Sequence, residues 1–167
     1  MHAFEKTQQM VADMVQYPTF SNLPRYLYKP DHPLAVLSAE GLRRALPHPQ
    51  SLIFLAFSAG CLTAASVAHY FHHRSDSQVL GLLAIDGWGV PLAAPFPVHR
   101  LSHDHFTHIT STFSSSRCHF YADPAVPHLQ IWQTPSQVRG WTMPAQQPTS
   151  AGAFIDARLN QYASLVL

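Results

Sequence analysis

Charged side chains are scarce in this chain of 167 residues, where Asp, Glu, Lys and Arg together make up 11%. An average soluble domain has about a quarter. The net charge is +1 and no basic run occurs, so the footprint of a nucleic-acid-binding protein is missing. So little surface charge is typical of a surface that is partly covered. We therefore expect a homodimer or a protein partner.

Cysteines and long apolar runs are also scarce. The two cysteines, Cys61 and Cys118, lie far apart, which excludes a disulfide framework and a cysteine-based zinc site. No apolar stretch reaches the roughly 20 residues that a membrane span needs. The first residues, 1–6, lack the pattern of a signal peptide. These absences predict a cytoplasmic protein without a membrane span.

What the chain does have is a large apolar fraction, 47%, in a length that suits one domain over residues 1–167. Two nearly continuous apolar runs, 51–57 and 79–85, flank a helical pattern at 62–73. Such strands are typical of a parallel sheet covered on both faces. We therefore expect an α/β fold. The other expected elements are helices at 4–16, 35–46, 106–113 and 153–165, strands at 25–29 and 129–132, and a loop over 137–150.

The first apolar strand runs directly into a turn of small residues. Ala56-Phe57-Ser58-Ala59-Gly60 stands between the strand and the helix that follows. A strand, a tight turn and a helix around small-x-Ser-x-Gly are the context of a nucleophile elbow, which exposes the serine hydroxyl. Ser58 is therefore the candidate nucleophile. The backbone N–H of Ala59, directly after it, is the candidate oxyanion donor.

A serine nucleophile needs a base and a group that orients the base. Asp86 follows the second apolar strand, and ligands of doubly wound sheets gather at the carboxyl ends of strands. Asp86 and Ser58 should therefore lie at the same sheet edge. Asp123, in a later segment rich in proline, is the alternative acid.

The base is harder to assign, because the chain has 12 histidines. His99, His103, His105 and His108 form the densest group, and His128 is a further candidate five residues after Asp123. His103, His105 and His108 with Asp104 also have ligand chemistry for a divalent ion. No HExxH and no paired cysteines accompany them, so we predict neither a metal site nor a cofactor.

Three of these segments together resemble a known family. The elbow 57–60 with its alanine-rich helix, the strand Gly81–Asp86, and Asp104-His105-Phe106-Thr107 are similar to α/β-hydrolase thioesterases that release polyketide and nonribosomal peptide chains. The resemblance covers about residues 4–113. It implies a three-layer α/β/α sandwich and a triad of Ser58, His105 and Asp86. Among the other histidines, His103 and His108 are the next candidates for the base, and His128 is a weaker one.

The resemblance also implies what differs. In the family, further strands precede the helix that corresponds to residues 4–16. The given sequence has too few residues before that helix to form them. We therefore expect a reduced fold with a shortened, mainly parallel sheet. Residues 114–167 should form an irregular extension with a terminal helix. A free sheet edge would then be covered in a dimer or by a partner. The expected function is hydrolysis of an acyl ester or thioester. The alternative is a degenerate hydrolase fold that serves as a binding or assembly module.

Overall fold

A mixed β-sheet organises the part of the chain that the structure, a computed structural model, describes: residues 26–28, 32–46, 51–87, 93–111 and 118–165. Six strands in these ranges follow one another across the sheet in chain order. The first four are parallel, and the last two are antiparallel to their neighbours. The strands are β1 (Ser51–Phe57), β2 (Gln78–Ile85), β3 (Val98–Ser102), β4 (His119–Ala122), β5 (Arg139–Met143) and β6 (Gln147–Ser150).

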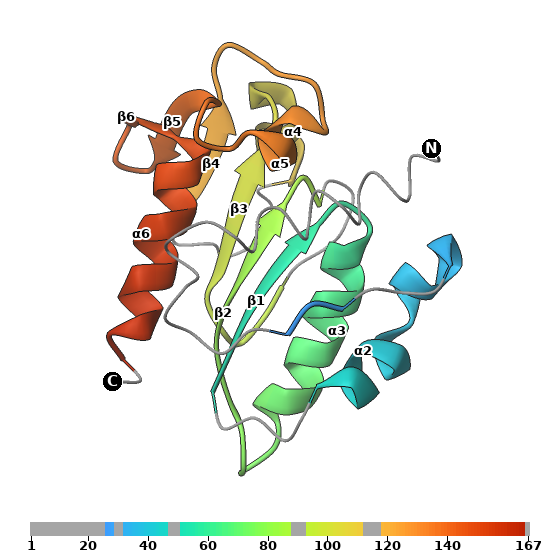
Figure 1. Ribbon diagram of the computed structural model, residues 1–167. Coiled ribbons are helices and arrows are strands. Elements are labelled where there is room, and N and C mark those ends of the chain that lie inside the picture. Colours follow the sequence, from blue (N-terminus) through green and yellow to red (C-terminus); the bar gives the residue numbers. More distant parts are fainter. Residues whose placement is uncertain (1–25, 29–31, 47–50, 88–92, 112–117, 166–167) are drawn as a thin grey trace.

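Helices lie on both faces of this sheet (Figure 1). On one face, α3 (Gly60–His72) packs on β1 and β2 and is itself contacted by η2 (Pro33–Leu37) and α2 (Ala39–Ala45). On the other face, α6 (Ala151–Ala163) crosses the strands. The short helices α4 (His105–Ser111) and α5 (Gln130–Gln133) lie where the parallel strands end.

The side chains of β1 explain why both faces are covered. Leu52, Phe54 and Ala56 are buried in the cluster beneath α3. The alternate residues Ile53, Leu55 and Phe57 pack against the second cluster, to which α6 contributes. Strands buried on both faces carry unbroken apolar sequences, so the α/β class is confirmed.

The apolar elements expected from the sequence are confirmed. They are the strands at 51–57 and 79–85, the elbow helix and the terminal helix. The helix expected at 106–113 is present as α4, although its last two residues lie outside the described ranges. The helix expected at 35–46 is divided at Ser38, whose side chain accepts a hydrogen bond from Gly41 N at 3.0 Å and so caps α2.

The polar half of the sheet was not expected. The strand predicted at 129–132 is wrong, because these residues enter helix α5. The loop predicted over 137–150 is wrong as well, since β5 and β6 form a hairpin there. The strand predicted at 25–29 is absent over 26–28, while the helix predicted at 4–16 lies outside the described residues.

One buried strand, β3, has a polar sequence. His99 lies inside the protein because its Nε2 is 2.6 Å from the hydroxyl of Tyr162 and its Nδ1 is 3.3 Å from the carbonyl of Cys118. Burial lowers the pKa of His99 to about 4, so the ring is neutral at neutral pH. Because buried polar groups with hydrogen-bond partners are tolerated in a strand, a buried strand such as β3 need not contain the apolar run by which buried strands are predicted. Among the described helices, none has the length and apolarity that a membrane span needs.

Candidate active site

Ser58 occupies the turn between β1 and α3 in a strained backbone conformation. Its φ is +52°, in the left-handed region that residues with a Cβ avoid. Its N–H continues the sheet by donating to the carbonyl of Ile85 at 2.8 Å, and its own carbonyl accepts from Cys61 N at 3.0 Å. The turn is thus held at both ends, as a nucleophile elbow requires.

The tightest packing at this turn is between the backbone of Gly87 and the side chain of Cys61, and it does not involve Gly60. A Cβ built on Gly87 would lie 2.8 Å from both Cβ and Sγ of Cys61. A Cβ on Gly60 would find its nearest described neighbour, Val36, at 3.8 Å. The glycine that the tight packing demands therefore follows Asp86, although the sequence pattern pointed to the glycine after the serine.

Asp86 is the buried acid of the site. It follows β2, its φ is +51°, and its side chain is fully buried. Its N–H donates to the carbonyl of Leu101 at 2.8 Å, and its Oδ1 accepts from the backbone N–H of His103 at 2.8 Å. Both bonds come from β3 or its end, so the neighbouring strand fixes the direction of the carboxylate.

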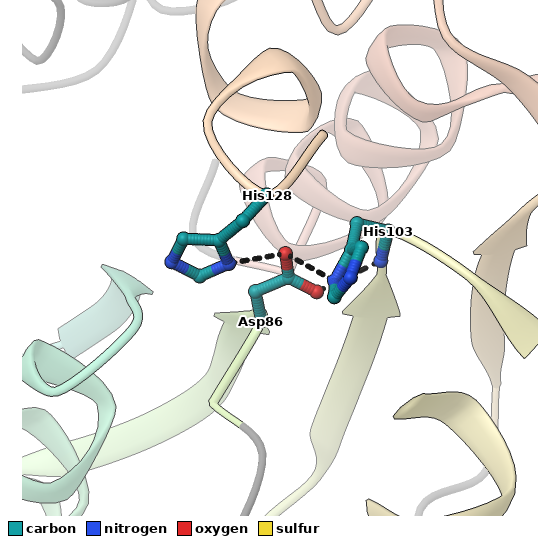
Figure 2. Close-up of side chains that lie close together, drawn as sticks. All are labelled: Asp86, His103 and His128. Atoms are coloured by element: carbon teal, nitrogen blue, oxygen red, sulfur yellow. Dashed lines mark hydrogen bonds and ion pairs between the residues drawn. The ribbon is translucent and has the colours of Figure 1, made fainter. Parts of the chain in front are cut away.

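His128 completes the contact with the acid. Its Nδ1 lies 2.8 Å from Asp86 Oδ2, and Figure 2 shows the other ring nitrogen turned away from the carboxylate. The ring stacks on Phe57, the residue before Ser58, at a centroid distance of 4.7 Å. Phe57 in turn stacks on Trp132 at 5.1 Å. The imidazole is therefore held between the acid and the end of the strand that carries the serine.

The loop that presents His128 is tied to the end of β3. Val126 donates its backbone N–H to the carbonyl of His103 at 3.0 Å. Asp123, the alternative acid, accepts from Trp141 Nε1 at 2.9 Å and donates its N–H to Arg139. Both contacts tie Asp123, which follows β4, to strand β5. The acid that His128 meets at the site is therefore Asp86.

A second histidine also reaches the acid. Nδ1 of His103 lies 2.9 Å from Asp86 Oδ2, but its approach does not suit a hydrogen bond, and this buried nitrogen has no hydrogen-bond partner among the described residues. Nε2 of His103 is 3.3 Å from a carboxylate oxygen of Asp104. Both histidines therefore converge on one carboxylate oxygen (Figure 2).

The structure does not bring His105 to the acid. This residue begins α4, and its ring contacts the rings of Tyr121 and His108 at 4.8 and 6.2 Å. Asp104 caps the helix, since its Oδ1 accepts from Thr107 N at 2.6 Å. His105 already belongs to the helix, whereas His103, directly after the end of β3, lies beside Asp86. The pKa of neighbouring His108 is lowered to about 4, first by burial and then by the charges of His119 and His105.

The remaining groups of the elbow are consistent with its geometry. Ala59 is exposed, and its N–H has no hydrogen-bond partner among the described residues, so it is free to donate to an oxyanion. The hydroxyl of Ser58 likewise makes no hydrogen bond to a described residue. Burial raises the pKa of Cys61 to about 12, which makes it a packing residue rather than a rival nucleophile.

From the sequence, His105 is the predicted base and His128 only an alternative. The missed signal was the strand β4, whose sequence His-Phe-Tyr-Ala leads into the proline-rich loop that carries His128. Once β4 is recognised, His128 follows a parallel strand just as Ser58 and Asp86 do. Comparisons with protein-family models, with curated proteins and with solved structures give no match. The function of the chain is therefore inferred from the geometry of Ser58, Asp86 and His128.

Proposed function

We propose that this protein is a serine hydrolase of acyl esters or thioesters, with Ser58 as nucleophile, His128 as base and Asp86 as the acid that orients the base. The observation that carries the proposal is the 2.8 Å contact between Asp86 Oδ2 and His128 Nδ1 beside a serine at φ +52°. A buried carboxylate on Nδ1 fixes the tautomer that leaves Nε2 able to accept a proton.

In the proposed reaction the Ser58 oxygen attacks the acyl carbonyl and passes its proton to Nε2 of His128. The tetrahedral oxyanion forms near the N–H of Ala59 at the start of α3, where the partial positive charge of a helix N-terminus also lies. His128 then protonates the departing alcohol or thiol, which leaves an acyl-enzyme on Ser58. Water, deprotonated by His128, attacks the acyl-enzyme, and His128 then returns the proton to the departing Ser58 oxygen as the acid is released.

The proposal includes the fold type, a shortened α/β-hydrolase sandwich in a cytoplasmic protein. Helices on both faces of a largely parallel sheet support it, as do the three site residues, each of which follows a parallel strand. β1 is the end strand of the sheet among the described residues. In this proposal a second copy or a protein partner adds at the β1 edge.

The test compares four variants with wild type in the hydrolysis of short p-nitrophenyl esters and acyl thioesters. Ser58→Ala and His128→Gln should each lower kcat/KM by about 10³-fold or more, and Ser58→Ala should abolish covalent labelling by a fluorophosphonate. His105→Gln and Asp123→Asn are the matched controls and should stay within about threefold of wild type. Persistent labelling of Ser58→Ala would refute the nucleophile, and a larger loss in His105→Gln than in His128→Gln would refute the base.

One observation favours a second candidate function, a binding or assembly module on a degenerate hydrolase fold. The hydroxyl of Ser58 has no hydrogen bond to His128, whereas a working triad joins serine and base at about 2.6–3.2 Å, often more loosely without substrate. Wild-type protein that neither turns over esters nor reacts with the fluorophosphonate would select this function over the enzyme.

A further inference from the structure

The three side chains in Figure 2 form a set of metal ligands as well as part of a triad. One carboxylate oxygen of Asp86 and one nitrogen each of His103 and His128 lie within 4.8 Å of one another. Among the described residues this is the one group of three or more His, Cys, Asp or Glu side chains that gather so closely. Two imidazoles and a carboxylate are a donor set that divalent transition metals bind in catalytic and oxygenase sites.

The nitrogen of His103 gives the independent reason to look for a ligand here. A triad requires one histidine on the acid, and His128 fills that role with a hydrogen bond to Oδ2. His103 Nδ1 is buried at the same oxygen, 2.9 Å away, without hydrogen-bond geometry. A buried ring nitrogen without a hydrogen-bond partner is costly in a folded protein. A metal ion bound here would accept the lone pair of His103 Nδ1 and so give this nitrogen a partner.

The distances suit a small ion. Zn²⁺ binds imidazole nitrogen at about 2.0–2.1 Å and carboxylate oxygen at about 2.0–2.2 Å, so ligand atoms around it lie roughly 3.3 Å apart. The two N···O separations here are 2.8 and 2.9 Å. The side chains of His103 and His128 are 21% and 35% exposed, so small ring rotations can admit the ion. The same exposure leaves a fourth position open to water.

We propose that Asp86, His103 and His128 bind one divalent transition-metal ion of the Zn²⁺ class, and that its binding switches off His128 as a base. The ion takes the lone pair of Nδ1 on His128, and the ring proton then resides on Nε2. A protonated Nε2 donates a hydrogen bond but accepts no proton from Ser58. Metal binding stands on its own observations, whereas the inhibition depends on the proposed hydrolase function.

Metal binding is measured first, on untagged full-length protein by titration calorimetry with Zn²⁺ and by the visible absorption of Co²⁺. Wild type should bind one ion, and His103→Gln and His128→Gln should each weaken the affinity by at least about tenfold, the scale on which even outer-shell partners act. Ser58→Ala should bind as wild type does, because Ser58 is no ligand. His73→Gln is the matched control, since His73 is exposed at the end of α3 and outside the cluster.

Inhibition is measured second, as the ratio of hydrolysis rates with and without saturating Zn²⁺. The ratio should fall at least about tenfold below one in wild type and return on chelation. In His103→Gln the Zn²⁺ concentration that halves the rate should be at least about tenfold higher than in wild type. Circular dichroism of each variant establishes that it is folded. Failure of wild type to bind one ion, or wild-type affinity in His103→Gln, would overturn the metal site. A bound ion that leaves the hydrolysis rate unchanged or raises it would overturn only the proposed inhibition. A protein that binds the ion but never hydrolyses esters would refute the proposed function, while the metal site would still stand.

Discussion

The strained backbone at Ser58 predicts that the elbow serine is kept at a cost in stability. At φ +52° a residue with a Cβ has about 1–2 kcal/mol of unfavourable energy, and glycine has none. Glycine also makes the unfolded chain freer, which costs about 0.5–1 kcal/mol. Ser58→Gly should therefore be more stable than Ser58→Ala by about 1 kcal/mol, or roughly 2–4 °C in Tm. Comparing these two variants cancels the loss of the hydroxyl.

The assay is urea unfolding of both variants with equal slopes, so that a difference in midpoint reports a difference in the free energy of unfolding. Ser66 supplies the control, because it is an exposed residue inside helix α3. At that position Ser66→Gly should be less stable than Ser66→Ala by about 1 kcal/mol, the opposite sign. Equal stability of the two Ser58 variants, or a more stable alanine, would contradict the strained turn.

Three further predictions concern the rest of the fold. Gly140→Ala should lower the free energy of unfolding by about 1–3 kcal/mol, since a Cβ there collides with the carbonyl oxygen of Tyr121, whereas Gly60→Ala should cost nothing in the same urea assay. Because burial lowers the pKa of His99 from 6.5 to about 4, the unfolded chain binds a proton more readily than the native one. The free energy of unfolding therefore has its full value above pH 6.5 and should fall by up to about 3 kcal/mol as the pH drops to 4. A free energy of unfolding that stays constant over this range would exclude the lowered pKa of His99. A thiol reagent should label Cys118 in the native protein and Cys61 only after unfolding, because Cys61 is fully buried; rapid native labelling of both thiols would contradict this.

The sequence allowed the apolar half of the fold to be predicted. β1, α3 and β2 have long apolar runs, and their order was enough to place Ser58 and Asp86 at one edge. Strands β3 to β6 are short and each contains polar residues, so no long apolar run marks them, and the polar groups buried in β3 depend on partners distant in the chain. An example is the contact of His99 with Tyr162, 63 residues away.

The choice among the histidines depended on those same strands. A short motif favoured His105, but the distance from a strand end decides which ring reaches the acid. His103 remains at the end of β3, whereas His105 has already entered α4. His128 reaches the acid because the loop after β4 is bound to His103 through Val126. Contacts of this kind are set by three-dimensional packing, which residue spacing alone does not encode.

The chain-order arrangement of the strands has a kinetic consequence. Each parallel strand pairs with the next one along the chain, so the sheet can grow one strand at a time, and each step closes a shorter loop than the pairing of strands from distant parts of the chain would need. The hydrogen bond between His128 and Asp86 instead joins residues 42 positions apart and needs β4 in place. In a refolding experiment, recovery of secondary structure should therefore run ahead of recovery of the fluorophosphonate-reactive state, and the interval would measure how late the site is assembled.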